Sequence, residues 1–168
     1  MKSRSFKICV IGDFAVGKTS TVARSVRKTF SETYLTTVGV RVDTKALKIA
    51  GSEQRLVLWD IAGVSVLEQM RSNYILGANG LLLVADGTRK ETVTIALSLR
   101  EQVHRRLGRL PPSALLLNKA DMIDAWDVPP ATIRELEREL AVFTTSAKTG
   151  QGVEESLQAL ATELVTQC

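Results

Sequence analysis

The sequence predicts an α/β fold built on a doubly wound, mostly parallel six-stranded sheet with one antiparallel edge strand and about five helices. Three observations support this fold class. Apolar strand-like runs alternate along the chain with segments whose apolar residues recur every three or four positions. The runs 81–85 and 114–117 are continuously apolar, as is typical of parallel strands covered on both faces. The run 40–45 alternates charged residues with valine and threonine, which indicates a half-exposed strand.

The first half of the chain predicts three strands and two helices. The apolar run 6–11 is a strand, and 18–29 is an amphipathic helix because Val22, Val26 and Phe30 recur every four residues. The alternating strand 40–45 is followed by a turn signal at 50–52 and a returning strand at 56–59. The order of elements places a further helix after that strand.

The second half continues the alternation of strands and helices. A helix with apolar residues at 96, 99, 103 and 107 separates the strands 81–85 and 114–117. Two prolines, 129 and 130, open a short helix that we expect to run through Leu140. A last strand, 141–145, and a last helix with inward positions 153, 157, 160 and 164 complete the expected order.

Length and composition indicate an ordinary soluble globule. The 168 residues fit one domain, residues 1–168, without a separate hypervariable tail. Apolar residues make up 45% and charged residues 24%, and the net charge is only +4. The basic residues occur in short runs typical of solvated helix faces, which argues against nucleic-acid binding. No apolar stretch approaches the length of a membrane span.

The two cysteines do not suggest a disulfide framework, which fits a reducing compartment and a cytoplasmic protein. Cys9 lies in the first strand and is most simply a small buried hydrophobe. Cys168 is the last residue, whereas a C-a-a-X lipidation signal needs cysteine at position 165, where valine stands. We therefore expect no stable membrane anchor.

Residues 12–19 match the phosphate-loop pattern G-x-x-x-x-G-K-[ST] between an expected strand and an expected helix. Gly12 and Gly17 permit backbone angles that let consecutive N–H groups converge on a phosphate. Lys18 can reach the β- and γ-phosphates, and the Thr19 hydroxyl can bind Mg²⁺. An isolated match would also fit a plain strand–turn–helix corner, but this context is the one that a P-loop NTPase fold requires.

Polar residues at the ends of three later strands fit a guanine nucleotide. Asp60 ends the third strand, where it can hold Mg²⁺ through water, and the Gly63 N–H can meet a γ-phosphate. Asp121 can accept from the N1–H and N2–H₂ of guanine, a donor pair that adenine lacks. The Lys119 stem can cover the base, and the Ala147 N–H can reach the guanine oxygen.

Each of these residues also has a structural explanation when taken alone. Asp60 could cap a helix, Asp121 could serve a turn, and Ser146 could be a simple helix cap. The coincidence of all the motifs in the right order, at the right strand ends, favours a shared nucleotide site.

The sequence resembles the Ras-superfamily small GTPases, and within them the Rab branch, from Phe6 to Leu164. The resemblance is carried by the phosphate loop, which opens with Gly12-Asp13, and by four further stretches of sequence. These are Thr36-Thr37-Val38-Gly39-Val40, Trp59-Asp60 with Ala62-Gly63, Asn118-Lys119-Ala120-Asp121 and Thr145-Ser146-Ala147-Lys148.

The resemblance implies GTP or GDP as ligand, Mg²⁺ as the metal and a role for each matching residue. The expected nucleotide contacts are Ala15, Val16, Gly17, Lys18, Thr19, Ser20, Phe30, Tyr34, Asn118, Lys119, Asp121, Ser146, Ala147 and Lys148. The expected metal ligands are Thr19, Thr37 and Asp60, and the expected γ-phosphate and switch contacts are Lys18, Thr37 and Gly63.

The resemblance also implies protein partners at the switch regions. Effectors, exchange factors and activating proteins would meet the chain around residues 37–42 and 59–74. Trp59 and Tyr74 match two members of the aromatic triad by which Rab proteins meet effectors. The third place is held by Val42, so this surface is altered.

Two departures from the family pattern bear on hydrolysis. Val64 stands where the family has the glutamine that orients the attacking water, and Ser65 follows it in place of glutamate. Phe14 stands in the phosphate loop where the family prefers glycine or serine, and its ring would crowd an arginine finger unless it packs under the switch. Glu68 or Gln69 could substitute for the missing glutamine, although both are expected on the switch helix.

We therefore expect a GTP/GDP switch with slow intrinsic hydrolysis. An alternative is a nucleotide-gated interaction module that binds GTP but barely hydrolyses it. A scaffold that no longer binds nucleotide is disfavoured, because the sequence retains Lys18, Thr19, Asp60, Asn118 and Asp121.

Overall fold

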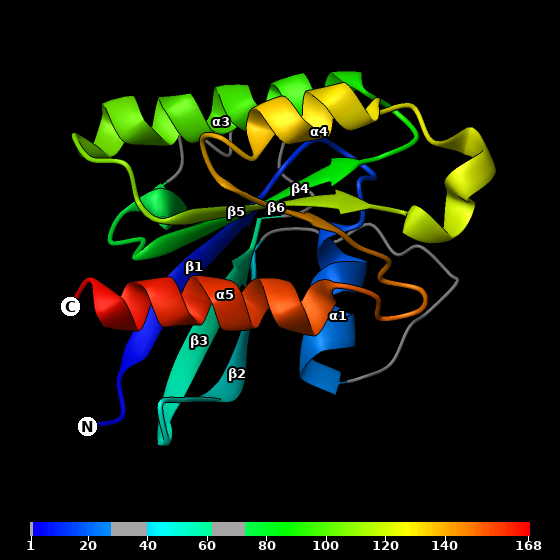
Figure 1. Ribbon diagram of the computed structural model, residues 1–168. Helices are drawn as coiled ribbons and strands as arrows, with labels where there is room; N and C mark the ends of the chain where they lie inside the picture. Colours follow the sequence, from blue (N-terminus) through cyan, green and yellow to red (C-terminus); the bar gives the residue numbers. More distant parts are fainter. Residues whose placement is uncertain (1, 28–39, 62–72) are drawn as a thin grey trace.

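The computed structural model describes residues 2–27, 40–61 and 73–168, and these form one sheet with helices on both faces (Figure 1). The strands are β1 (Ser5–Ile11), β2 (Arg41–Ile49), β3 (Ser52–Asp60), β4 (Gly80–Asp86), β5 (Ser113–Asn118) and β6 (Ala141–Thr144). The α-helices in these ranges are α1 (Lys18–Arg27), α3 (Glu91–Leu107), α4 (Pro130–Leu136) and α5 (Val153–Thr166). Short 3-10 helices span Asn73–Ile75 and Ala120–Ala125.

The sheet has the strand order β2-β3-β1-β4-β5-β6. Only the edge pair β2–β3 is antiparallel, and the other neighbours run parallel. Helices α1 and α5 cover one face, and α3 and α4 cover the other (Figure 1). The predicted α/β class and the mostly parallel six-stranded sheet are confirmed. The helix expected after the third strand, and residues 28–29 of the first helix, lie outside the described residues.

Alternate residues of the central strands supply two separate cores. On β4, Leu82 and Val84 face the layer of α1 and α5, where they join Leu157 and Leu160. The intervening side chains of β4, Leu81 and Leu83, face α3 and α4. Because successive side chains of a strand point to opposite faces, a strand covered on both sides must be apolar throughout. This explains the continuous apolar runs in the sequence.

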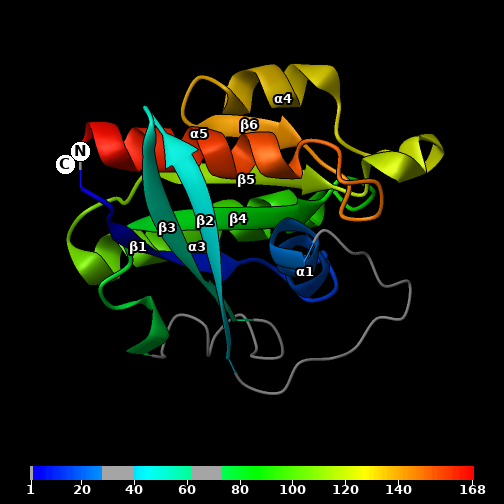
Figure 2. The same cartoon turned by 90° about the horizontal axis from the view of Figure 1, so that it is seen from below.

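The hairpin of β2 and β3 is longer than predicted from the sequence. Its register runs from Arg41 opposite Asp60 to Ile49 opposite Ser52. Both turn residues have positive φ, 50° at Ala50 and 81° at Gly51, as a tight hairpin requires. Figure 2 shows the hairpin along the edge of the sheet beside α5.

The end of one helix also differs from the sequence prediction. Helix α4 ends at Leu136 rather than Leu140, because the chain then tightens: the N–H of Arg138 donates to the Glu135 carbonyl and that of Glu139 to the Leu136 carbonyl. The tighter turns return the buried Leu140 to the core. Helix α3 begins at Glu91, ahead of its first expected apolar position.

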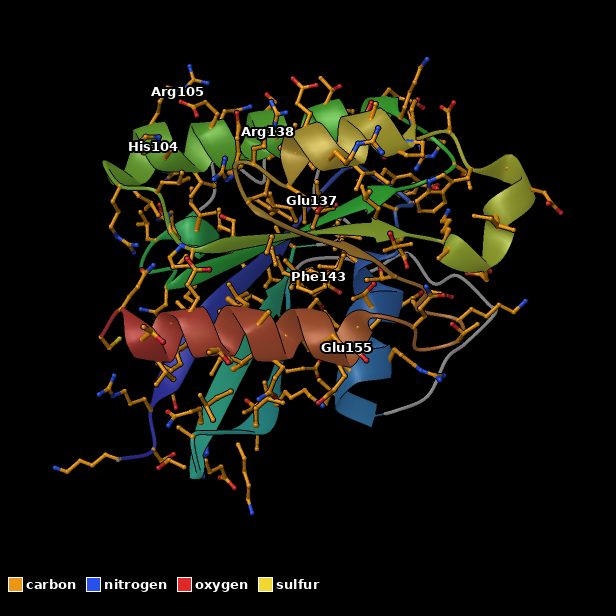
Figure 3. All side chains as sticks on the ribbon, viewed as in Figure 1. His104, Arg105, Glu137, Arg138, Phe143 and Glu155 are labelled. Atoms are coloured by element: carbon orange, nitrogen blue, oxygen red, sulfur yellow. The ribbon has the colours of Figure 1, made fainter. Side chains whose placement is uncertain are left out.

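Helix α3 runs antiparallel to β4, so its C-terminal end lies away from the carboxyl end of that strand (Figure 1). Figure 3 shows His104 and Arg105 at that end of the helix, consistent with surface positions for both. In the described ranges, none of the helices combines the length and the apolar character needed to cross a bilayer.

Candidate functional site

The phosphate loop joins β1 to α1, and both of its glycines are required by their surroundings. A Cβ on Gly12 would lie 2.2 Å from the carbonyl oxygen of Val84 on the neighbouring strand β4. Gly17 has a φ of +102°, and a Cβ there would lie 2.3 Å from Nδ2 of Asn118. Any side chain at either position would therefore force the loop away from the sheet.

Lys18 is a buried cation at the start of α1, only 5% exposed. Its Nζ donates to the carbonyls of Gly12 at 2.9 Å and Asp13 at 2.6 Å. Burial lowers the pKa of Lys18 to about 8, against the charges of Asp60 and Asp13, which favour protonation. In the part of the chain that the structure describes, no carboxylate lies within ion-pair distance of it. Among the described residues the acceptors of this ammonium are backbone carbonyls, an environment well suited to receive a phosphate.

The backbone of the phosphate loop is fixed by the expected guanine-binding residues. Asn118 Nδ2 donates to the Val16 carbonyl at 2.9 Å, and Lys119 Nζ donates to the Ala15 carbonyl at 3.1 Å. Asn118 is the last residue of β5 and Lys119 follows it, so the carboxyl ends of β1 and β5 are joined through side chains. The predicted phosphate and base residues therefore lie together.

The expected metal ligands Thr19 and Asp60 are also adjacent. Thr19 Oγ1 donates to Oδ2 of the fully buried Asp60 at 2.7 Å. Hydroxyl and carboxylate oxygens are the donors that Mg²⁺ prefers, and this ion keeps several waters and binds through few protein ligands. Across residues 2–27, 40–61 and 73–168 there is no cluster of three or more His, Cys, Asp or Glu able to hold a metal ion alone. The pair fits a Mg²⁺ that is shared with phosphates.

The expected guanine-binding residues at the ends of β5 and β6 lie next to one another. Oδ1 of Asn118 accepts from the Ala147 N–H at 3.1 Å, which connects the two strand ends. In this structure the N–H expected to reach the guanine oxygen is therefore bound to Asn118. Ser146 Oγ donates to Oδ1 of Asp121 at 2.6 Å, and it also accepts from the Thr149 N–H at 3.1 Å. Within the described residues Oδ2 of Asp121 has no protein donor. This exposed oxygen can accept from a base, so the arrangement fits guanine recognition.

Asp86, at the end of β4, is a buried carboxylate that the sequence prediction missed. Thr88 donates to its Oδ1, and Lys119 Nζ lies 2.9 Å from its Oδ2. Burial favours the neutral acid, but hydrogen bonds from Thr88, Lys119 and Arg89 outweigh it, so the pKa of Asp86 is lowered. A polar residue closing a continuous apolar strand, as Asn118 does, was the signal available in the sequence.

The remaining expected site residues are only partly described. Ser20 lies partly buried on α1, and the Lys148 side chain is exposed beyond β6. Several expected residues lie outside the described residues: Phe30, Tyr34, Thr37, Gly63, Val64, Ser65, Glu68 and Gln69.

A tryptophan fastens the loop after β5 to the turn after β4. A Cβ on Gly87 would lie 2.0 Å from the Trp126 ring, so the ring rests directly on the glycine backbone. The Asp127 N–H donates to the Gly87 carbonyl at 2.7 Å, and the Gly87 N–H donates to the Asn118 carbonyl at 2.8 Å. The loop that follows the expected guanine-binding residues is thereby fixed to the turn after β4.

Comparison with protein-family models adds independent evidence. The Ras family model matches residues 7–166, nearly the whole chain. This range includes the phosphate loop, the adjacent Thr19 and Asp60, and the strand ends that carry Asn118 and Asp121. The chain therefore belongs to the Ras family of small GTP-binding switch proteins, which bind GTP, GDP and Mg²⁺, hydrolyse GTP and act through regulator and effector proteins.

Proposed function

We propose that this protein is a Rab-like switch whose intrinsic GTP hydrolysis is slow. The observation that carries the proposal is the identity of residue 64, a valine where the family has a water-orienting glutamine. Phosphoryl transfer to water depends on positioning and electrostatics rather than on covalent chemistry by the protein. Valine can neither donate to nor accept from a water molecule. The substitution leaves the switch able to bind GTP and reach its active state, but the return to the GDP-bound state by hydrolysis becomes slow.

Assignment of the individual site residues is part of the same proposal. Lys18 and the N–H groups of residues 15–20 would hold the phosphates, and Asn118, Lys119, Asp121 and the strand end 146–148 would hold guanine. Phe30 and Tyr34 would close over the nucleotide. Thr19, Asp60 and Thr37 would hold Mg²⁺, while Thr37 and Gly63 would sense the γ-phosphate. The hydrogen bonds that join Thr19 to Asp60 and Asn118 to Val16 support this arrangement.

The position of Phe14 supports weak stimulation of hydrolysis by activating proteins. Its side chain is 58% exposed on the phosphate loop, and its backbone N–H is already taken by Oδ1 of Asp13 at 2.8 Å. A ring that projects from this loop occupies space that an activating protein would need for an arginine finger, which is worth ~10³–10⁵ in rate. The protein would then respond weakly to ordinary activators.

The Rab-like assignment is supported by the surface that β2, β3 and the 3-10 helix Asn73–Ile75 form. Trp59 and Tyr74 lie with ring centroids 6.3 Å apart, and Lys7 Nζ sits 4.0 Å from the centre of the Trp59 ring. Val42 is the cross-strand partner of Trp59 and is 47% exposed. The three positions of the effector triad therefore lie close together, with a small aliphatic side chain where a third aromatic would stand.

A single-turnover assay tests the slow hydrolysis. We expect GTP loaded on the wild type to persist, and Val64→Gln to speed its hydrolysis by about tenfold or more. Val64→Leu is the matched control, because leucine restores no group that could orient water. A wild-type rate equal to that of an ordinary Rab, or equal acceleration by both substitutions, would contradict the proposal.

A second candidate function is a nucleotide-gated interaction module that barely hydrolyses GTP and is reset by exchange. The joint presence of Val64 and Phe14 favours it, because both affect the γ-phosphate side of the site. Phosphate release with candidate activating proteins separates the two functions: a switch completed by a partner should release phosphate, and an exchange-driven module should not. GTP retained on the purified protein would show weak intrinsic hydrolysis in either case.

A further inference from the structure

Three consecutive carbonyls of the phosphate loop are each held by a side chain from another part of the chain. Arg89 Nη2 donates to the Phe14 carbonyl at 2.9 Å. Lys119 Nζ holds the next carbonyl, that of Ala15, and Asn118 Nδ2 holds the one after it. The donors come from the turn after β4 and from the end of β5, and together they brace the loop from one side.

This brace fixes the direction of the N–H groups that follow. In a planar trans peptide the C=O and the next N–H point in opposite directions. Carbonyls 14, 15 and 16 are bound to the brace, so the N–H groups of residues 15, 16 and 17 are turned away from it. N–H groups of a phosphate loop that point away from its support are the donors available to the phosphates.

The first braced peptide needs outside support because Ala15 has a φ of +59°. A side chain rarely adopts this left-handed conformation, and such strain persists only where the surroundings fix it. Arg89 binds the carbonyl before Ala15, and Lys119 binds the carbonyl of Ala15 itself. The N–H of Phe14 is occupied by Asp13, so the phosphate donors begin with Ala15.

Asp86 fixes both basic side chains of the brace. Its Oδ2 lies 3.1 Å from Arg89 Nε and 2.9 Å from Lys119 Nζ, and the carboxylate is only 1% exposed. The guanidinium uses Nε toward Asp86 and Nη2 toward Phe14, in two directions from one rigid plane. A lysine at this position has a single donor nitrogen and cannot reproduce that fork.

We propose that Arg89 is a positioning residue for nucleotide binding: it holds the Phe14–Ala15 peptide so that the Ala15 N–H points at the phosphates. Its counterparts in the brace, Lys119 and Asn118, belong to the guanine motif, whereas Arg89 lies outside every motif of the sequence. The Asp86 carboxylate links Arg89 to Lys119 and so joins base recognition to the shape of the phosphate loop. The role is independent of the hydrolysis rate.

The test compares three variants of the full chain in the GDP-bound form. We expect Arg89→Ala to speed release of a fluorescent GDP by about tenfold, since a lost hydrogen bond to a charged group is typically worth that factor or more. Arg89→Lys should also speed release, because it keeps the charge but loses the fork. Lys90→Ala is the matched control: it removes the same charge from the next residue, an exposed side chain, and should release GDP as the wild type does.

Phosphorus NMR of bound GDP supplies a readout that a merely structural role would not move. In Arg89→Ala and Arg89→Lys we expect a shifted phosphate resonance, with circular dichroism spectra like those of the wild type. Unchanged release and an unchanged phosphorus spectrum in either folded variant would overturn the proposal. So would faster release matched by Lys90→Ala, which would show an effect of charge alone. If Arg89→Ala did not fold, GDP release and the phosphorus spectrum of Arg89→Lys would test the proposal.

Discussion

Lys18 is the residue whose charge responds most directly to the nucleotide. Burial lowers the pKa of its ammonium to about 8, so the nucleotide-free protein carries a weakened base at the centre of the phosphate loop. A bound phosphate would favour the protonated form again. Binding at a pH above the lowered pKa must therefore take up a proton.

We expect affinity for GDP to fall as pH rises above about 8, by up to about tenfold per pH unit. The free energy of unfolding of the nucleotide-free protein should change in the opposite direction and increase with pH. Because the unfolded pKa of 10.5 exceeds the folded value of about 8, the unfolded state binds more protons between them, and stability rises with pH across that window. Calorimetric titration in two buffers of different ionisation enthalpy measures the uptake. Uptake at about pH 8.5 no greater than at about pH 7 would contradict the expectation.

Most described site residues could be predicted from the sequence because their motifs are local. Lys18, Thr19, Asn118 and Asp121 occur in short patterns, and strand order brings the patterns together. Arg89 could not be predicted in this way. Its role depends on a contact with Phe14, 75 positions away, that no local spacing encodes.

The buried position of Lys45 could not be predicted from the sequence either. The alternation of residues 40–45 indicates a half-exposed strand but does not say which face is covered. In the structure the lysine lies on the covered face, where its Nζ donates to the Ser25 carbonyl and pairs with Glu154 at 3.0 Å. The same face continues with the buried Leu47 and Ile49.

At the scale of elements, the phosphate loop depends on close packing against β5. We expect Gly17→Ala to abolish nucleotide binding, because the new methyl group would meet Asn118 Nδ2 and displace the donor that holds the Val16 carbonyl. Gly108→Ala is the matched control. Its φ of +70° imposes similar backbone strain, yet nothing lies within 4 Å of the added atom.

The control should cost about 1 kcal/mol of stability and leave affinity for GDP unchanged. Equilibrium binding of a fluorescent GDP, together with thermal melts, measures both effects. If Gly17→Ala bound GDP as tightly as Gly108→Ala does, the packing of the loop against Asn118 would not matter for the nucleotide.

The sequence predicts which strands and helices form better than it predicts the residues at which they end. Apolar runs fix the central strands, because burial on both faces leaves few alternatives. Strand β2 extends through Ile49 because its backbone stays paired with β3 as far as Ser52. Helix α4 ends early because its last turn tightens into 3-10 geometry, which the spacing of Ile133, Leu136 and Leu140 does not distinguish from continued helix.

At the scale of the whole molecule, stability rests on the two cores that the sheet separates. Leu115 on β5 is fully buried in the layer of α3 and α4, whereas Leu110, just before the same strand, is 40% exposed. We expect Leu115→Ala to lower the free energy of unfolding by about 2–5 kcal/mol, because it leaves a cavity in a packed core. Leu110→Ala should cost well under half of that. Urea unfolding of the GDP-bound variants measures the difference, and equal losses would contradict the two-core description.

The seating of Trp126 on Gly87 has a practical consequence. The chain contains only two tryptophans. One belongs to the expected effector surface, and the other lies beside the expected guanine-binding residues. The half-buried Trp59 lies beside Tyr74, with ring centroids 6.3 Å apart, and Trp126 is fixed beside the strand ends that carry Asn118. Intrinsic fluorescence of the unlabelled protein therefore contains two separable signals. A Trp59→Phe variant would isolate emission from the base side, and a Trp126→Phe variant would isolate emission from the side that meets effectors.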